Sequence, residues 1–231
     1  MIKAITFDLD DTLWPILPVI LRAEKSSKRW LIDNYPAMEN VLGEDIVTSV
    51  RKDLIYKNPD LTNQLSRLRT LSVRELAKRA GYDTKIAEKI GEDAFKIFFS
   101  YRNKVVFYDN VLQVLDSLKS KYILGSLTNG NADLKKIGLD RVFSFHFSSS
   151  DLNASKPDPD HFLAAIRETG LKPEEICHVG DNFSHDVLGA RNTGLKAIWF
   201  NNQGLKSNQN SIQVPEISSW LELENQINSL T

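Results

Sequence analysis

Two different patterns of hydrophobic residues divide this chain. Between about residues 19 and 101, apolar side chains recur every three or four positions among Lys, Arg and Glu, which predicts amphipathic helices. Before Asp8 and after about residue 105, short apolar runs indicate strands, and helical patterns separate the later ones. The helices predicted for the first stretch cover residues 19–35, 40–56, 72–80 and 84–101.

Strands that alternate with helices predict an α/β fold with a doubly wound parallel sheet. Because the helical stretch contains no convincing strand, we expect a core of residues 1–14 and 105–231 and an inserted helical domain of residues 15–104. The core strands are expected near residues 2–7, 122–127, 143–148, 176–179 and 196–200, the helices at 110–120, 160–169, 185–192 and 219–230, a short helix from 133, and loops at 149–159 and 201–215.

The first predicted strand ends in a cluster of acids. Ile5 and Phe7 are apolar, whereas Asp8, Asp10 and Asp11 follow within four positions. Asp8 and Asp10 project to the same side of an extended segment, and burying a carboxylate without a cation is costly. A solvated turn after an edge strand is the alternative interpretation, because Asp and Thr favour turns.

Three other segments near strand ends carry polar side chains. These are Thr128 with Asn129, the loop that bears Lys156, and Asp181 with Asp186. The carboxyl ends of parallel strands lie at one edge of a doubly wound sheet, where such folds bind ligands. We therefore expect all four polar segments, including the one at Asp8, to meet in one site.

Composition excludes several classes of protein. The 231 residues are 42% hydrophobic and 26% charged, with a formal net charge of −1, so we expect neither nucleic-acid nor membrane binding. Cys177 is the single cysteine and the N-terminus shows no signal-peptide pattern, which favours the cytoplasm. We expect a monomer or a homodimer.

The four polar segments resemble the motifs of the haloacid dehalogenase-like superfamily, in order and across nearly the whole chain. Asp8-Leu9-Asp10-Asp11-Thr12 matches the first motif, Thr128-Asn129-Gly130 the second, Lys156-Pro157 the third and residues 180–186 the fourth. The helical insert after the first motif is similar to the α-helical cap of subfamily I. The resemblance implies hydrolysis of a small-molecule phosphate ester with Mg²⁺ as cofactor.

In such a phosphatase, Asp8 would attack phosphorus and form an aspartyl-phosphate. Asp10 would protonate the leaving alcohol and then deprotonate the attacking water, which requires a pKa above its ordinary value. The resemblance implies Mg²⁺ bound by Asp8, the backbone carbonyl of Asp10 and Asp181, with Asp186 binding it directly or steadying a bound water or Lys156. Asp186 capping the following helix is the alternative.

Substrate contacts are assigned to the second and third motifs. Thr128 would donate its hydroxyl to a phosphoryl oxygen, with a helix N-cap as the alternative role. Asn129 would orient substrate or loop, and the backbone N–H groups of Leu9 and Asn129, beside Gly130, would complete the phosphate cradle. Lys156 would place a positive charge near both phosphate and Asp8; alone, a loop lysine is usually solvated.

Specificity is expected in the cap, where aromatic rings could stack on a flat substrate. Trp14 is the best candidate because it follows the acids directly, whereas Trp30 is expected in the core. Pro18 to Arg22, Leu127 to Ala132 and His178 to Asp181 also resemble bacterial phosphatases of this superfamily that act on flavin mononucleotide. The other candidates in the cap are Tyr35, Tyr56, Arg22, Arg67, Arg69 and Arg74.

Three alternatives remain open. A haloacid dehalogenase shares the fold and nucleophile but uses no metal; Asp10 argues against it, because a departing halide needs no proton. A phosphomutase would be stimulated by a bisphosphate, and a binding protein on this fold would lack catalysis. His146, His161, His178 and Cys177 are interpreted as structural, since their spacing fits no zinc site, and His185 occupies a variable position of the fourth motif.

Overall fold

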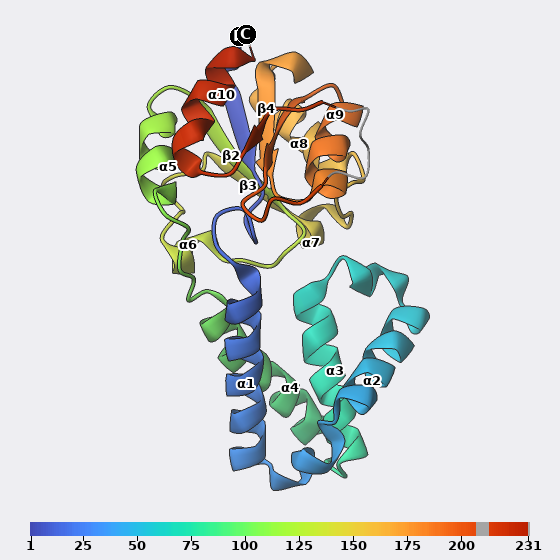
Figure 1. The fold of residues 1–231 in the computed structure, drawn as a ribbon. Helices are drawn as coiled ribbons and strands as arrows, with labels where there is room; N and C mark the ends of the chain where they lie inside the picture. Colours follow the sequence, from blue (N-terminus) through green and yellow to red (C-terminus); the bar gives the residue numbers. More distant parts are fainter. Residues whose placement is uncertain (207–212, 231) are drawn as a thin grey trace. The chain divides into compact units, whose positions relative to one another are not determined.

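The structure, a computed structural model, describes residues 1–206 and 213–230. These residues form two compact units, one of residues 1–15 and 106–231 and the other of residues 16–105 (Figure 1). Part of the predicted loop 201–215, residues 207–212, lies outside the described residues. No helix in the described part of the chain has the length and apolar character needed to cross a bilayer.

The first unit is built on a parallel sheet in the order β3-β2-β1-β4-β5-β6. The first strand, β1, lies inside the sheet, where Ala4 is in register with Ile123 of β2 and with Ile176 of β4. The fold class predicted from the sequence is thereby confirmed. The strands are β1 (Ala4–Phe7), β2 (Ile123–Thr128), β3 (Phe145–Ser148), β4 (Ile176–Gly180), β5 (Lys196–Phe200) and β6 (Glu216–Ile217).

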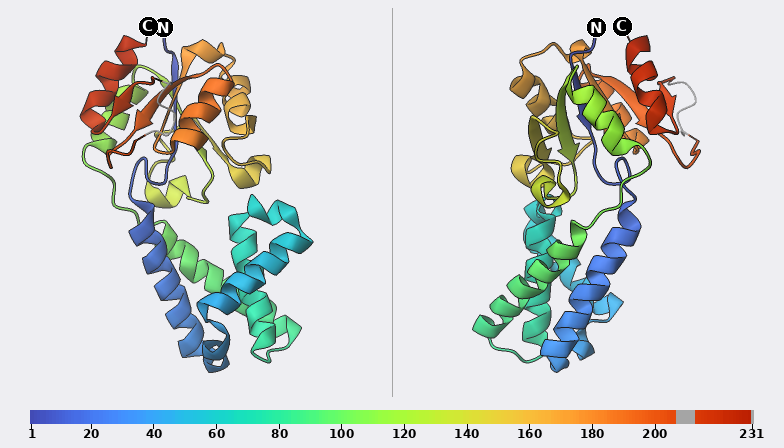
Figure 2. Two further views of the ribbon diagram at one scale, coloured as in Figure 1. Left: turned by 45° about the vertical axis from the view of Figure 1, so that its right-hand side comes forward. Right: turned by 90° about the vertical axis from the view of Figure 1, so that its left-hand side faces the viewer.

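Helices cover both faces of this sheet (Figures 1 and 2). α5 (Val111–Lys119) and α10 (Leu223–Ser229) lie on one face, and α8 (Asp160–Thr169) and α9 (Gly189–Asn192) lie on the other. The central strands are buried throughout, as the apolar runs predict for a parallel sheet covered on both sides. This burial holds in place the strands whose carboxyl ends are followed by the polar segments.

The second unit consists of four α-helices with short 3₁₀ turns between them. α4 packs against both α1 and α3, and α2 packs against α3. The side chain of Asp83 accepts a hydrogen bond from the backbone N–H of Ile86 and so caps α4. The bounds are α1 (Ile16–Asn34), α2 (Glu44–Lys57), α3 (Leu65–Arg79) and α4 (Thr84–Arg102).

Several boundaries differ from the sequence-based prediction. α3 begins at Leu65 rather than at residue 72, and the predicted loop 149–159 contains the short helix α7 (Ser149–Leu152). The predicted helix 185–192 is a π-helical turn, η4 (Phe183–Leu188), followed by α9. The two-residue strand β6 and the helix α6 (Leu134–Ile137) are too short to give a hydrophobic period, so pattern alone does not bound them.

Candidate active site

The polar segments meet in one open cavity of about 190 Å³ in the first unit. Its walls come from the residues that follow β1, β2 and β4 and from the loop that bears Lys156. The sheet therefore brings together side chains that are distant in sequence, as expected for the carboxyl edge of parallel strands. The cavity is lined by Asp8, Asp10, Asp11, Thr128, Asn129, Gly130, Lys156, Asp181, Asn182, His185 and Asp186.

Asp8 lies directly beyond the last residue of β1. Its backbone N–H donates to the carbonyl oxygen of Val179 at 2.9 Å, which continues the pairing with β4 past the strand end. The Lys156 ammonium donates to Asp8 Oδ1 at 2.7 Å, and the lysine side chain is only 2% exposed. Lys156 is therefore a buried partner of Asp8 and not a solvated loop lysine.

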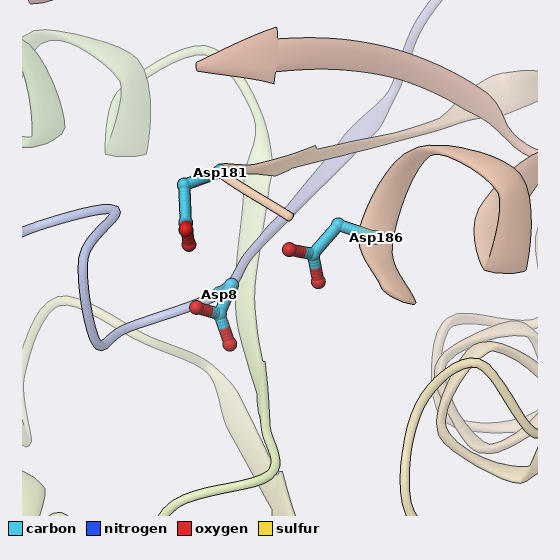
Figure 3. Close-up of side chains that lie close together, drawn as sticks. All are labelled: Asp8, Asp181 and Asp186. Atoms are coloured by element: carbon cyan, nitrogen blue, oxygen red, sulfur yellow. The ribbon is translucent and has the colours of Figure 1, made fainter. Parts of the chain in front are cut away.

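Three carboxylates converge at this edge. Asp8 and Asp181 directly follow β1 and β4, Asp186 belongs to η4, and the three side chains lie close together (Figure 3). One oxygen atom from each lies within 4.8 Å of the others. Three ionised carboxylates and one ammonium leave two uncompensated negative charges in a small volume, which a divalent cation would neutralise.

This crowding shows in the pKa values. Burial raises the pKa of Asp8 well above its ordinary range, against the opposing effect of Lys156, and the charges of Asp186 and Asp181 raise it further. Burial and the Asp186 charge raise the pKa of Asp181 to about 7. Both carboxyls therefore resist ionisation unless a further cation is bound, so the site favours a divalent metal.

Asp186 is held by the protein on both of its oxygens. Oδ1 accepts from Lys156 Nζ at 2.6 Å and lies 3.2 Å from His178 Nε2, while Oδ2 accepts from the backbone N–H of Asn182 at 3.0 Å. Burial alone would raise its pKa, but Lys156 and His178 hold the pKa of Asp186 below its ordinary value. These hydrogen bonds favour a role in fixing Lys156, one of the roles expected for Asp186.

The approach of Asp186 to β4 depends on Gly180. A Cβ atom added at Gly180 would lie 2.3 Å from Asp186 Cγ, closer than any real contact of this kind. The absence of a side chain at the last residue of β4 is thus what lets the Asp186 carboxylate sit beside the strand. The glycine of the Gly180-Asp181 pair in the fourth motif is therefore required for steric reasons.

Thr12 is a site residue to which the sequence analysis gave no role. Its hydroxyl donates to Asp181 Oδ1 at 3.1 Å and accepts from the backbone N–H of Asp181 at 3.0 Å, so it holds both the carboxylate and the backbone of that residue. The indole N–H of Trp199 donates to the backbone oxygen of Asp181 at 2.7 Å. The sequence signal for Thr12 was its place as the last residue of the first motif, four residues after Asp8; no signal pointed to Trp199.

The second motif shapes the loop around Lys156. Asn129 Oδ1 accepts from the backbone N–H of Lys156 at 2.7 Å, and Asn129 Nδ2 donates to the Lys156 backbone oxygen at 2.9 Å. Thr128 Oγ1 accepts from the backbone N–H of Gly130 at 2.9 Å. Asn129 thus orients the lysine loop. Because the Gly130 N–H is the donor in its bond to Thr128 Oγ1, the Thr128 hydroxyl keeps its own proton for another acceptor, as donation to a substrate requires.

The structure does not support the expected role of Trp14 as a stacking surface. The Trp14 side chain is fully buried, so neither face of its ring is open to a substrate. Its indole N–H donates to Asp10 Oδ1 at 2.9 Å. The sequence places an aromatic residue beside the acids but cannot tell that its ring packs inward. Leu9 is also fully buried, and its backbone N–H remains the group we expect at the phosphate.

His178 was interpreted as structural, but it belongs to the support of the site. Its Nδ1 lies 2.8 Å from Thr6 Oγ1 on β1 and its Nε2 faces Asp186, so it links two strands to the carboxylate cluster. Burial lowers the pKa of His178 and, to about 4, that of His161, so both rings are neutral near pH 7. Cys177 is buried with a pKa raised to about 12 by burial, which excludes an active thiolate.

The donor set fits Mg²⁺. The ligating atoms are carboxylate oxygens, which hard divalent cations prefer, and their joint negative charge requires compensation. Asp8 and Asp181 are the members of the cluster with raised pKa values, whereas Asp186 already has cationic and amide donors. Asp8 and Asp181 are thus the side chains best suited to hold the ion.

Comparison with known proteins defines the class. Residues 2–194 match the haloacid dehalogenase-like hydrolases, and the chain belongs to this family. Among curated proteins, it is 31% identical over 198 residues to the 5-amino-6-(5-phospho-D-ribitylamino)uracil phosphatase YigB of Escherichia coli, covering 86% of this chain and 83% of that protein. It is 27% identical over 208 residues to a glyceraldehyde 3-phosphate phosphatase of Methanopyrus kandleri, with the same two coverages.

A solved structure resembles the whole chain. The 2-haloacid dehalogenase from Pseudomonas syringae pv. Tomato DC3000 superposes with a TM-score of 0.97 at 33% identity and covers 100% of both chains. These comparisons confirm the predicted family and its hydrolase class. The relatives named as phosphatases support the assignment of a phosphatase.

Proposed function

We propose that this protein is a Mg²⁺-dependent phosphatase that hydrolyses a small phosphate monoester through an aspartyl-phosphate on Asp8. The observation that carries the proposal is the placement of the Asp8 carboxylate at the cavity, hydrogen-bonded to Lys156 and adjacent to Asp181. A phosphate monoester is an anion, so an anionic nucleophile reaches phosphorus only where positive charge is concentrated. Lys156 supplies part of that charge.

The predicted catalytic and metal-binding residues of the cavity then have defined tasks. Asp8 attacks phosphorus, and Asp10 gives a proton to the departing alcohol and later takes one from water. The Thr128 hydroxyl and the backbone N–H groups of Leu9 and Asn129 hold the phosphoryl oxygens. Mg²⁺, held by Asp8, Asp181 and the backbone carbonyl of Asp10, would neutralise charge on the phosphate and on the nucleophile.

For the substrate, we favour a ribityl phosphate carried by a flat heterocycle. The relative from Escherichia coli is named for such a compound, and flavin mononucleotide, suggested by the resemblances of residues 18–22, 127–132 and 178–181, has the same ribityl phosphate. Both are primary alkyl esters, whose alkoxide leaves only with a proton. That requirement agrees with an acid at Asp10. The expected setting is the cytoplasm, where a lone buried cysteine is ordinary.

Phosphate release from a panel of esters, with Mg²⁺ and with a chelator, tests the proposal. The panel comprises flavin mononucleotide, the ribitylaminouracil phosphate, nucleotides, sugar phosphates and 4-nitrophenyl phosphate. Asp8→Asn, nearly isosteric, is expected to abolish turnover, whereas Asp140→Asn, the same change at an exposed position, leaves it intact. Wild-type turnover by Asp8→Asn would refute the covalent mechanism, and turnover in chelator would refute the need for metal.

A 2-haloacid dehalogenase is the second candidate, because of the superposition with the Pseudomonas syringae protein. The two functions differ in their demand on Asp10: an alkoxide needs a proton and a halide does not. Halide release from 2-chloropropionate, insensitive to chelator and to Asp10→Asn, would establish this alternative. Phosphate release that is lost in Asp10→Asn would exclude it as the explanation of the site.

A further inference from the structure

The ring of Trp14 is fully buried, and its one polar atom, Nε1, is hydrogen-bonded to a residue of the site. A buried indole N–H without an acceptor is costly, and this one donates to Asp10 Oδ1 at 2.9 Å. An indole can only donate, so its partner oxygen must accept. The carbonyl oxygen of a carboxylic acid is a better acceptor than its hydroxyl oxygen, so this bond favours Oδ2 as the oxygen that carries the proton.

The indole is held on a closed loop. Asp10 and Trp14 form a β-bridge, the backbone N–H of Asp11 donates to the Trp14 oxygen at 2.8 Å, and that of Leu13 donates to the Leu9 oxygen at 2.8 Å. Asp11 has φ of 61°, the left-handed conformation that turns the chain back. The loop is fixed before any ligand binds.

Contacts from outside the loop hold it in place. The backbone N–H of Tyr108 donates to the Leu13 oxygen at 2.9 Å, and the Phe107 ring meets the Trp14 ring edge-on with centroids 5.7 Å apart. The indole N–H therefore has little freedom to follow a moving carboxyl group. A rigid donor of this kind selects one orientation of the Asp10 side chain.

We propose that Trp14 is the positioning residue for proton transfer by Asp10, an inference that rests on the proposed phosphatase function. As the Asp8–phosphorus bond forms and the ester P–O bond breaks, the proton leaves Asp10 Oδ2 for the ester oxygen. In the second step water forms a bond to phosphorus, the Asp8–phosphorus bond breaks, and a water proton returns to Oδ2. Trp14 Nε1–H stays bonded to Oδ1 throughout.

The test compares two esters in the holoenzyme with Mg²⁺. Flavin mononucleotide loses an alkoxide, which needs the Asp10 proton, whereas 4-nitrophenyl phosphate loses a stable anion that does not. Trp14→Phe keeps the buried ring and removes the donor. The free energy of a hydrogen bond to a charged group corresponds to a change in rate of about ten- to hundred-fold. The loss of this bond should therefore lower kcat/KM for flavin mononucleotide by roughly that factor. For the aryl ester it should change less than about threefold.

Two controls separate positioning from packing. Phe107→Leu loosens the ring contact but keeps the indole donor, so it should lower kcat/KM for flavin mononucleotide less than Trp14→Phe does. In an Asp10→Asn background, Trp14→Phe should add no further loss, because its effect passes through Asp10. Equal losses on both esters from an active wild type, or additive losses in the double variant, would overturn the inference. A wild type that releases phosphate from neither ester would instead refute the proposed function, on which the positioning role of Trp14 rests.

Discussion

Replacing Lys156 by Met should destabilise the protein more than the removal of any single carboxylate of the site does. The ammonium donates to Asp8 Oδ1 at 2.7 Å, to Asp186 Oδ1 at 2.6 Å and to the Leu127 backbone oxygen at 2.6 Å, and the residue is 3% exposed. Met has a similar length and no charge, so it leaves two buried carboxylates without their shared cation. Breaking a buried pair in this way costs about 3–5 kcal/mol of unfolding free energy.

Asp8→Asn is the matched comparison, because it removes the other partner of the same hydrogen bond. The raised pKa of Asp8 means that its ionisation costs native stability at neutral pH in the metal-free protein. Neutralising it should therefore leave stability unchanged or higher, while Lys156 keeps its bond to Asp186. The expected order of stability is Asp8→Asn at or above the wild type, and Lys156→Met below it.

Urea unfolding in chelator measures this order. Tryptophan fluorescence suits it, because three of the four tryptophans, Trp14, Trp199 and Trp220, lie in the first unit. The deficit of Lys156→Met should narrow as the pH falls from about 7.5 to 5, since its unpaired carboxyls can then take up protons. A deficit below about 1 kcal/mol at pH 7.5, a deficit independent of pH, or equal losses in both variants would refute this account of the charges.

Two further predictions concern the same edge of the sheet. Gly180→Ala should reduce turnover at least tenfold, because its Cβ would lie 2.3 Å from Asp186 Cγ and push that carboxylate from Lys156; full activity in a phosphate-release assay would contradict the steric argument. Mg²⁺ affinity, measured by calorimetry, should weaken as the pH falls below about 7, because the pKa of Asp181 is raised to about 7 and Mg²⁺ competes with its proton. For the same reason, between the ordinary pKa of Asp181 and pH 7 the folded metal-free protein binds more protons than the unfolded protein. Its stability should therefore fall as the pH rises through that range. A Mg²⁺ affinity that does not change between pH 5.5 and 7.5 would contradict both statements.

The sheet and the meeting of the four polar segments were predictable because both depend on strong, local signals. Strands buried on both faces give continuous apolar runs, and β1, β2, β4 and β5 have such runs. The polar residues after them could be placed at one edge without knowing the strand order, since all parallel strands end there. The loop that bears Lys156 could be placed there as well, because it follows the predicted strand 143–148, but the role of the lysine came from the family resemblance.

The supports of the site could not be predicted, because they depend on contacts between distant segments. Nothing local to His178 shows that it spans from Thr6 to Asp186, and nothing local to Trp199 shows that its N–H reaches the Asp181 backbone. The misassignment of Trp14 has the same origin. Whether an aromatic ring faces a cavity or the interior is decided by neighbours such as Phe107, which the sequence does not place.

The interior position of β1 has a consequence for the order of events during synthesis. Ala4 is made before its partners Ile123 and Ile176, and the Asp8 carboxylate gains the ammonium group of Lys156 only when that residue has been made. A ribosome-bound chain shorter than about residue 186 lacks members of the cluster that gives Asp8 its surroundings. The nascent polypeptide thus carries the proposed nucleophile long before it acquires the groups that would let it act.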